Sequence, residues 1–366
     1  MAERGAVPDV PVARRRVLRA VRSFTSPLLP DDYLELINPL FSTRELRGRV
    51  ERIERETADA VTVLIRPGWE WPGHRPGQYV RLGVAVNGVH HWRAYSLTSE
   101  PRRADGCIAI TPKLVEDGRV SPFLCSRLTV GTIVRLGGVE GTFVLPEPTP
   151  ERLLFVSAGS GITPVMSMLR SLAREGRLGD VVHVHCSRSA GAVIFAHELH
   201  ALDARHDGYA LRMRLSAEQG RLRGEELDAV CPDWREREAF ACGPAGLLDS
   251  LRERFDADGD GARLHFERFQ PDEHVGDGER GSGGTIRFCS SGVEAFSDGE
   301  QPILAAGESA GAELPHGCRM GICHSCVGRL RSGRVRDLRT GRVHGQAGEV
   351  LRTCINAPEG AIEIDL

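Results

Sequence analysis

Residues 315–326 read Pro315-His316-Gly317-Cys318-Arg319-Met320-Gly321-Ile322-Cys323-His324-Ser325-Cys326, and one more cysteine, Cys354, follows after 27 further residues. This C-x4-C-x2-C…C spacing is typical of a plant-type [2Fe–2S] site. Four thiolates must converge on two irons, so three come from one folded loop and the fourth from a separate segment. The loop's two glycines allow backbone N–H groups to approach the cluster closely. The spacing therefore predicts four metal ligands: Cys318, Cys323, Cys326 and Cys354.

Two other metal sites use similar residues. Structural zinc usually takes two C-x2-C-like pairs, and this segment holds only one. A Rieske-like centre would use His324, but four cysteines are already in place. The remaining cysteines are scattered through or beside apolar stretches and are expected to be buried, reduced thiols: Cys107, Cys125, Cys186, Cys231, Cys242 and Cys289.

Residues 284–366 resemble a plant-type ferredoxin domain along their whole length. Residues 285–288 read as its first strand, and residues 301–307 as the turn into a helix. The ligand loop and the segment around Cys354 follow in the family's order. The resemblance implies a β-grasp-like α+β domain that carries one electron at a time.

The composition limits the class of protein. The 366 residues exceed one ordinary domain of about 150 residues, and 41% hydrophobic with 27% charged residues indicates folded cores. A balance of 47 basic and 50 acidic residues argues against nucleic-acid binding. The apolar runs are of strand length, and no apolar segment follows the arginines of residues 14–22. We expect a cytoplasmic protein.

Upstream, the segment Arg93-Ala94-Tyr95-Ser96 fits a flavin site. Arginine can form a forked contact with a phosphate, tyrosine can stack on a flat ring, and serine can hydrogen-bond a ring nitrogen. Strand alternation places Arg93 and Tyr95 on one face and Ser96 on the other. Taken alone, the segment also fits an ordinary strand.

A second segment, Leu153 to Pro164, runs from an apolar strand through Gly159-Ser160-Gly161 into a helical pattern. Proline suits the first turn of a helix, where no N–H is needed. N–H groups at such a helix start can bind a dinucleotide pyrophosphate. The third glycine of the standard G-x-G-x-x-G fingerprint is absent, and a lone G-x-G also occurs in ordinary loops.

Together these segments resemble the ferredoxin–NADP reductase superfamily, over residues 45–270. Residues 113–121 are similar to its K-x4-G-x2-S element, which binds the flavin pyrophosphate. Residues 159–164 are similar to its G-x-G-x-T-P segment. Residues 181–188 are similar to the strand that contacts the adenosine ribose, and residues 242–244 are similar to its C-G-P strand end. The resemblance implies these cofactor-binding residues: Arg93, Tyr95, Ser96, Lys113, Gly118, Val120, Ser121, Gly159, Gly161, Thr163, Ser187, Arg188, Cys242, Gly243 and Pro244.

The cofactor choices rest on two details. Arg188 could pair with a 2′-phosphate, which favours NADPH over NADH. The Gly118–Ser121 element, followed by Pro122-Phe123-Leu124, looks more like the FAD-binding members than the phthalate-type dioxygenase reductases, which use FMN. We therefore expect FAD. Ser96 and Cys242 are the predicted catalytic residues, positioned beside the flavin and nicotinamide rings.

The expected architecture is an antiparallel Greek-key flavin barrel, an α/β nicotinamide domain with a parallel sheet, and the ferredoxin domain. The predicted boundaries are 1–44 for an N-terminal extension with a helix near residues 31–40, 45–148 for the barrel, 149–270 for the nicotinamide domain, 271–283 for a linker and 284–366 for the ferredoxin domain.

The predicted activity is hydride transfer from NADPH to FAD, then single-electron transfer through the cluster to a separate acceptor protein. This domain order resembles that of the reductases of membrane acyl-CoA desaturases and di-iron hydroxylases. Ring-hydroxylating dioxygenases and cytochromes P450 are alternative acceptors. A non-catalytic redox-sensing scaffold is an alternative function of another class. An arginine run could dock an acidic partner or a membrane-bound one, or simply be solvated: Arg329, Arg331, Arg334, Arg336, Arg339 and Arg342.

Overall fold

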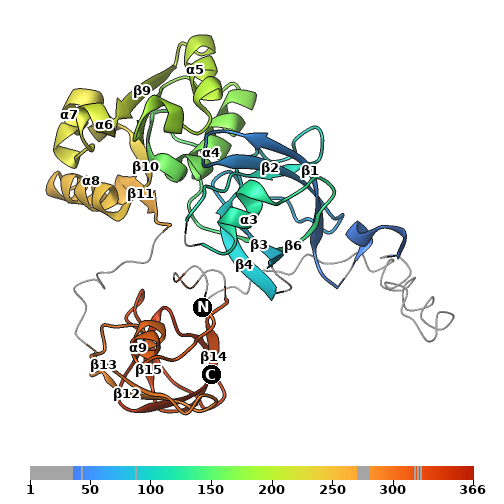
Figure 1. Cartoon of the computed structure of the whole chain (residues 1–366). Helices are drawn as coiled ribbons and strands as arrows, with labels where there is room; N and C mark the ends of the chain where they lie inside the picture. Colours follow the sequence, from blue (N-terminus) through green and yellow to red (C-terminus); the bar gives the residue numbers. More distant parts are fainter. Residues whose placement is uncertain are drawn as a thin grey trace.

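The structure, a computed structural model, describes residues 36–42, 44–86, 89–116, 118–269, 281–316, 319, 321 and 324–366. Its described part forms three units (Figure 1), here called the barrel unit, the parallel-sheet unit and the C-terminal unit. Residues 31–35 of the predicted N-terminal helix and residues 271–280 of the predicted linker lie outside the described residues. Within that helix, Leu36 and Ile37 are helical, and η1 (Pro39–Phe41) is a 3-10 helix.

The barrel unit is a six-stranded antiparallel sheet in the order β4-β3-β6-β1-β2-β5. Its strands are β1 (Arg47–Arg55), β2 (Val61–Pro67), β3 (Tyr79–Val86), β4 (Val89–Ser96), β5 (Ile108–Ile110) and β6 (Ile133–Glu140). An antiparallel bridge between Leu97 and Ile110 joins the two edge strands and closes the sheet. Closure of this kind pairs the two edge strands with each other, as in other antiparallel barrels. The short helix α3 (Ser121–Ser126) packs Leu124 into this core.

The parallel-sheet unit has the strand order β11-β10-β7-β8-β9, with every pair parallel. The strands are β7 (Leu153–Ala158), β8 (Val181–Ser187), β9 (Tyr209–Leu215), β10 (Glu238–Cys242) and β11 (Leu264–Glu267). Because β10 returns to the other side of β7, the strand order reverses between them. In open parallel sheets, ligands bind outside the carboxyl ends of the strands at such a point.

Helices cover both faces of this sheet (Figure 1), which explains why its central strands β7 and β10 are mostly apolar and buried. The helices are α4 (Ile162–Arg174), α5 (Ala196–Arg205), α6 (Ser216–Gln219), α7 (Leu227–Val230) and α8 (Ala245–Ala257), with 3-10 turns η2 (Gly159–Gly161), η3 (Ala190–Ala192), η4 (Gly224–Glu226), η5 (Trp234–Glu236) and η6 (Gly261–Arg263). One core joins α4 and α5 to Phe155 and Phe240, and the other joins α7 and α8 to Trp234.

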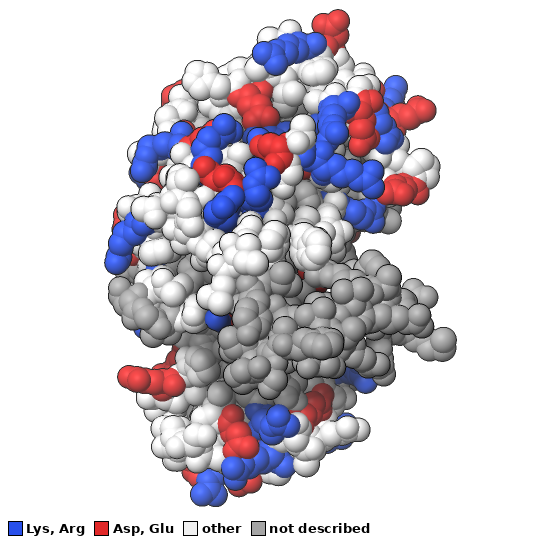
Figure 2. Space-filling view, turned by 90° about the vertical axis from the view of Figure 1, so that its right-hand side faces the viewer, with Lys and Arg blue, Asp and Glu red and all other residues white. Residues whose placement is uncertain are grey.

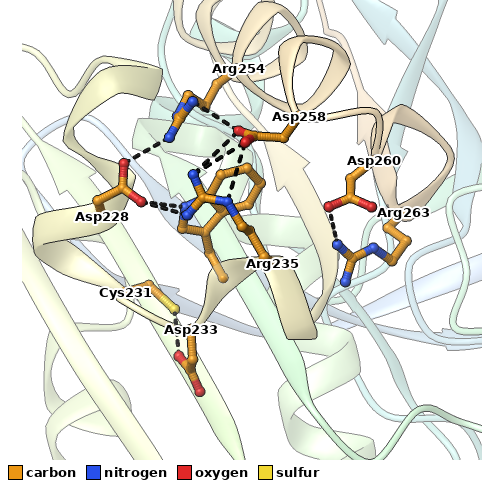
Figure 3. A network of polar contacts seen from close by, with 9 residues as sticks. Asp228, Cys231, Asp233, Arg235, Arg254, Asp258, Asp260 and Arg263 are labelled. Atoms are coloured by element: carbon orange, nitrogen blue, oxygen red, sulfur yellow. Dashed lines mark hydrogen bonds and ion pairs between the residues drawn. The ribbon is translucent and has the colours of Figure 1, made fainter.

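A charged network that includes Asp228, Arg235, Arg254 and Asp258 (Figure 3) lies beside the second core, which holds Trp234. The buried ring has Arg235 and Arg254 against it, with guanidinium carbons 4.5 and 5.2 Å from its centroid. Asp228 accepts hydrogen bonds from Arg235 at 2.7 Å, from the indole N–H at 3.1 Å and from Arg254 at 2.8 Å. These bonds lower the pKa of Asp228. The network binds η5 to α7 and α8, on the side of the unit away from α4.

The C-terminal unit pairs its strands in the order β13-β12-β19-β14-β17, with a second sheet β16-β15-β18. The strands are β12 (Gly284–Phe288), β13 (Glu294–Ser297), β14 (Val327–Ser332), β15 (Val335–Asp337), β16 (Val343–His344), β17 (Val350–Arg352), β18 (Asn356–Pro358) and β19 (Ile362–Asp365), and the helix is α9 (Ile303–Ser309). The strand and helix expected at its start are both present.

Figure 2 shows basic and acidic side chains interspersed over the upper part of the face that it views. Such mixing agrees with the small net charge of −3. Across the described residues, every helix is too short or too polar to cross a bilayer.

Candidate functional site

A large cavity of about 1390 Å³ lies where the three units meet. The barrel unit contributes residues 90–96 and the loop around α3, the parallel-sheet unit contributes Ser160, Thr163 and residues 267–269, and the C-terminal unit contributes Glu308 and residues 312–316. Figure 1 shows the C-terminal unit on the side of the barrel where β3 and β4 lie. Ligand sites are commonly found at such domain interfaces.

Strand β4 brings Arg93, Tyr95 and Ser96 to the wall of this cavity. The Ser96 hydroxyl is sealed from solvent and has no hydrogen-bond partner among the described residues. Burial raises the pKa of Tyr95, whose ring packs against the barrel core. Arg93 Nη1 donates to the carbonyl of Trp92 at 2.8 Å. A buried hydroxyl without a partner costs stability, so Ser96 fits a site built for a polar ligand.

The predicted phosphate element is a tight turn on the same wall. Its residues Lys113, Gly118, Val120 and Ser121 all line the cavity. The Gly118 N–H donates to the Val115 carbonyl at 2.9 Å, and the Ser121 hydroxyl accepts from the Val115 N–H at 3.0 Å. The Ser121 hydroxyl therefore closes the turn, and helix α3 begins at this residue. Lys113 Nζ lies 3.3 Å from Asp59 Oδ2.

The glycine segment after β7 lies at the point where the strand order reverses. Gly159 has φ +54°, which glycine adopts without strain. A Cβ on Gly161 would lie 2.1 Å from the carbonyl oxygen of Cys242, so only glycine fits there. Thr163 Oγ1 donates to the carbonyl of Ser160 at 2.9 Å, and both residues line the cavity.

The C-G-P segment ends strand β10, beside the glycine segment. Cys242 is fully buried, and its thiol pKa is raised by burial and then by the carboxylate of Glu267. Gly243 leaves room for Ala158, whose Cβ would be 3.0 Å from a Cβ at that position. Pro244 caps helix α8. Cys242, Gly243 and Pro244 thus lie at the carboxyl edge of the sheet, although they do not line the cavity itself.

Glu267 is a site residue that the sequence analysis missed. It pairs in register with Cys242 across β10 and β11 and lines the cavity with Arg268 and Phe269. Its Oε2 is sealed from solvent without a partner among the described residues, and burial raises its pKa to about 8. The available signal was an acidic residue at the end of a strand, but the strand order was needed to place it.

Ser187 and Arg188 stand apart from the cavity, at the carboxyl end of β8. Ser187 is buried and Arg188 is exposed. The Arg188 carbonyl accepts from the Ala217 N–H at 3.1 Å, which fixes the backbone after the strand. Because β8 neighbours β7, this position is where a dinucleotide fold reads the ribose next to the adenine.

Two of the four predicted metal ligands are described, and Cys318 and Cys323 lie outside the described residues. Cys326 and Cys354 are buried, and their sulfurs lie 3.0 Å apart. The Gly321 N–H donates to Cys354 Sγ at 3.2 Å, the kind of contact that stabilises a thiolate. Arg352 braces the loop by donating to the Gly321 carbonyl at 2.7 Å.

A second brace joins the ligand loop to helix α9. Both terminal nitrogens of Arg319 contact the Glu308 carboxylate at 2.7 Å. Arg319 has φ +59°, and the forked ion pair helps to hold this uncommon backbone conformation. Glu308 and Arg319 line the cavity described above, together with residues of the barrel unit.

The residues present fit three cofactors. The unpartnered Ser96 hydroxyl suits a flavin ring, the glycine cradle at the strand reversal suits a dinucleotide, and the converging sulfurs of Cys326 and Cys354 suit an iron–sulfur cluster.

Comparison with known protein families gives the same three assignments. An oxidoreductase FAD-binding domain matches residues 70–145, an oxidoreductase NAD-binding domain matches residues 155–253, and a 2Fe-2S iron-sulfur cluster binding domain matches residues 286–359. The predicted cofactors FAD, NAD(P)H and a [2Fe–2S] cluster are confirmed, as is the fold of three such domains. The predicted boundaries enclose these matches and otherwise stay predictions.

Individual relatives extend over nearly the whole chain. An NADPH oxidoreductase of Mycobacterium tuberculosis is 47% identical over 93% of this chain and 90% of its own length. The ferredoxin reductase component of a 3-ketosteroid-9-alpha-monooxygenase from Rhodococcus rhodochrous is 30% identical over 78% of this chain and 86% of its own. The solved structure of phthalate dioxygenase reductase has the same fold, with a TM-score of 0.57 and 22% identity over 87% of this chain and 97% of that one.

The chain therefore belongs to the ferredoxin–NADP reductase superfamily, among the members that carry a C-terminal [2Fe–2S] ferredoxin domain, and it is an NAD(P)H-dependent oxidoreductase.

Proposed function

We propose that this protein is the NADPH-dependent reductase of a separate oxygen-activating enzyme. The observation that carries the proposal is the shared cavity, because strand β4, the end of β11 and the cluster-binding unit all line it. A hydride donor, a flavin and a one-electron centre must approach one another, and this cavity offers one place for all three.

The cofactors supply the chemistry: the flavin accepts two electrons with the hydride, and the cluster passes them on one at a time. In the proposed arrangement the Ser96 hydroxyl hydrogen-bonds the flavin ring and Tyr95 packs beside it. The turn of residues 113–121 holds the pyrophosphate. Cys242 and Glu267 lie at the strand ends where the nicotinamide would enter, and Gly161 leaves the backbone open for it.

Arg188 supports NADPH rather than NADH. It is exposed at the end of β8, and neither Ser187 nor Arg188 offers the carboxylate with which NAD-specific sites usually bind the ribose hydroxyls. A guanidinium at this position matches a 2′-phosphate in charge and shape. The name of the 47% identical relative, an NADPH oxidoreductase, agrees with this choice.

For the acceptor, the sequence resemblance favours a fatty-acyl desaturase or a di-iron hydroxylase. The name of the ketosteroid monooxygenase relative supports the alternative of an oxygenase. These candidates share one requirement, a supply of single electrons to an oxygen-binding metal centre. We propose an acceptor of this class, as a separate protein; contact with a membrane-bound acceptor is part of the same proposal.

Anaerobic titration of the purified holoprotein tests the proposal. NADPH should bleach the flavin absorbance and then reduce the cluster, and NADH should do so at higher concentration. Arg188→Ala should raise the NADPH concentration required by about tenfold and leave the response to NADH unchanged. Arg205→Ala is the matched control, since Arg205 is exposed at the far end of α5. A spectrum indifferent to both nucleotides would indicate a redox-sensing scaffold instead.

A further inference from the structure

The outer face of strands β14 and β17 has no assigned role. Four of its residues form what we call the exit face: Val327, Arg329, Val350 and Arg352. The two strands are antiparallel and place Val327 opposite Arg352 and Arg329 opposite Val350. Their alternate residues Gly328, Leu330 and Leu351 are buried. The exit face is therefore the solvent side of the sheet, and its two valines are 38% and 57% exposed.

This face adjoins the cluster through the chain itself. Val327 directly follows Cys326, and Arg352 precedes Cys354 by two residues. The Thr353 N–H donates to the Cys326 carbonyl at 2.9 Å, which binds the two ligand segments to each other. Any protein seated on the exit face would thus lie close to two of the four thiolates.

The residues of the C-terminal unit that line the shared cavity, among them Arg319 and Ser325, do not include the exit face. Glu308 and His316 line the cavity as well. Electrons that arrive from the barrel unit would reach the cluster from the cavity. The exposed valines of the exit face are accessible to a second protein in the described part of the chain.

The two arginines of the exit face form no ion pair among the described residues, although Asp365, which pairs with Arg331, lies opposite Arg329 on the neighbouring strand. Within the arginine run noted in the sequence, Arg331, Arg336 and Arg339 pair with Asp365, Glu359 and Asp337. Arg329 donates to the Gly348 carbonyl at 2.9 Å, and Arg352 donates to the Gly321 carbonyl. In the described part of the chain, no carboxylate forms an ion pair with either of them. The adjacent Glu349 accepts from the Gln346 N–H at 3.0 Å.

We propose that the exit face is the docking surface for the electron acceptor, and that the acceptor presents an acidic surface with an apolar centre. The inference deepens the proposed function and rests on it. Each encounter transfers one electron: the cluster is oxidised by one electron and the acceptor's metal centre is reduced by one. The arginines steer and orient an acidic partner, and the valines exclude water from the contact.

Two forms of one redox protein can test the charge of the partner. Native cytochrome c is basic, and cytochrome c succinylated on its lysines is acidic. Holoprotein reduced with dithionite would be mixed with each form in a stopped-flow instrument, and reoxidation of the cluster followed by its visible absorbance. We expect the acidic form to react about tenfold faster at low ionic strength, with the difference shrinking as salt screens it. The whole chain has a net charge of −3, so overall charge favours the opposite order.

Arg329→Glu should remove the preference for the acidic cytochrome. Val350→Glu should weaken the same preference, because Val350 lies opposite Arg329 on the neighbouring strand. Arg334→Glu is the control, because Arg334 is also exposed and lies beyond the end of β14, on the order of 20 Å along the strand from Cys326. Iron and sulfide content verifies that each variant keeps its cluster. Equal rates for the two cytochromes, or equal effects of the variants at positions 329 and 334, would overturn the docking proposal. Chemical reduction bypasses NADPH, so failure of the proposed function would appear separately, in the NADPH titration.

Discussion

Gly161 packs directly against Cys242: a Cβ on Gly161 would meet the carbonyl oxygen of Cys242 at 2.1 Å and its carbonyl carbon at 2.5 Å. The two residues end neighbouring segments, since η2 follows β7 and Cys242 ends β10. This contact fixes the separation of the two strand ends where the strand order reverses. The proposed nicotinamide site depends on that separation.

Gly161→Ala should therefore push these strand ends apart. We expect a loss of about 1–3 kcal/mol of stability, the usual cost of overpacking, and weaker NADPH binding. Gly179→Ala is the control, because a Cβ at Gly179 meets nothing within 4 Å. Thermal unfolding and an NADPH titration measure the two effects. If both variants bind NADPH like the parent, the contact does not shape the site.

Ser96→Ala should leave the stability of the flavin-free protein unchanged or higher, but it should weaken the binding of FAD. In the flavin-free protein the buried hydroxyl has no partner among the described residues, so its removal should leave the melting temperature unchanged or higher. With FAD, loss of one hydrogen bond of about 0.5–1.5 kcal/mol should weaken binding by roughly two- to tenfold. Fluorescence titration with FAD measures the affinity. A variant that binds FAD as tightly as the parent would show that Ser96 does not contact it.

The parts of the site that the sequence predicted are those set by local chemistry. The cysteine spacing reflects the geometry of metal ligation within one loop. The segment from Leu153 to Pro164 combines an apolar strand, glycines and a helix-starting proline, and the structure has β7, η2 and α4 there. Strand β8 ends at Ser187, one residue before the predicted end.

The parts that the sequence did not predict depend on strand order and long-range pairing. Glu267 joins the site only because β11 lies beside β10, in register with Cys242. The sequence of the arginine run did not predict which of its arginines form ion pairs. The acidic partners of Arg331 and Arg336 come from β19 and from the turn after β18. Their positions follow from the fold of the whole domain, not from spacing in the sequence.

The Glu267→Gln variant should lack the change in folding stability that the parent protein shows near pH 8. Burial raises the pKa of Glu267 from 4.5 to about 8, so the folded protein holds this carboxyl protonated at neutral pH. Its contribution to stability is complete below pH 4.5 and is lost as the pH rises through 8. The variant should therefore become more stable than the parent at pH 9 and not at pH 5.

The rate of flavin reduction by NADPH, measured from pH 6 to pH 10, tests the same group in the site. The parent should change rate near pH 8, and the Gln variant should not. Glu253→Gln, on the exposed side of α8, serves as the control. A parent rate that is constant over this range would contradict a role for the Glu267 carboxyl in the reaction.

A buried histidine network makes the parallel-sheet unit sensitive to acid. The Ser157 hydroxyl lies 2.8 Å from His183 Nε2 and 2.7 Å from His185 Nδ1, and His183 Nδ1 lies 2.7 Å from the Tyr209 hydroxyl. Both histidines are fully buried, and burial lowers their pKa values, to about 4 for His185. Both rings are therefore neutral in the folded unit at pH 7.

The unfolded chain takes up protons on these rings below their ordinary pKa of 6.5, so stability is complete above that pH and is lost as the pH falls toward 4. Each histidine should lower the free energy of unfolding by up to about 1.4 kcal/mol for each unit by which the pH falls over this range. Hydrogen exchange of the β8 amides at pH 7, 6 and 5 measures the loss within this unit alone. His185→Gln should make exchange less sensitive to acid once the intrinsic pH dependence of exchange is removed. His197→Gln, at an exposed position of α5, should not. If the two variants keep the same acid sensitivity as the parent, the network is not the source of it.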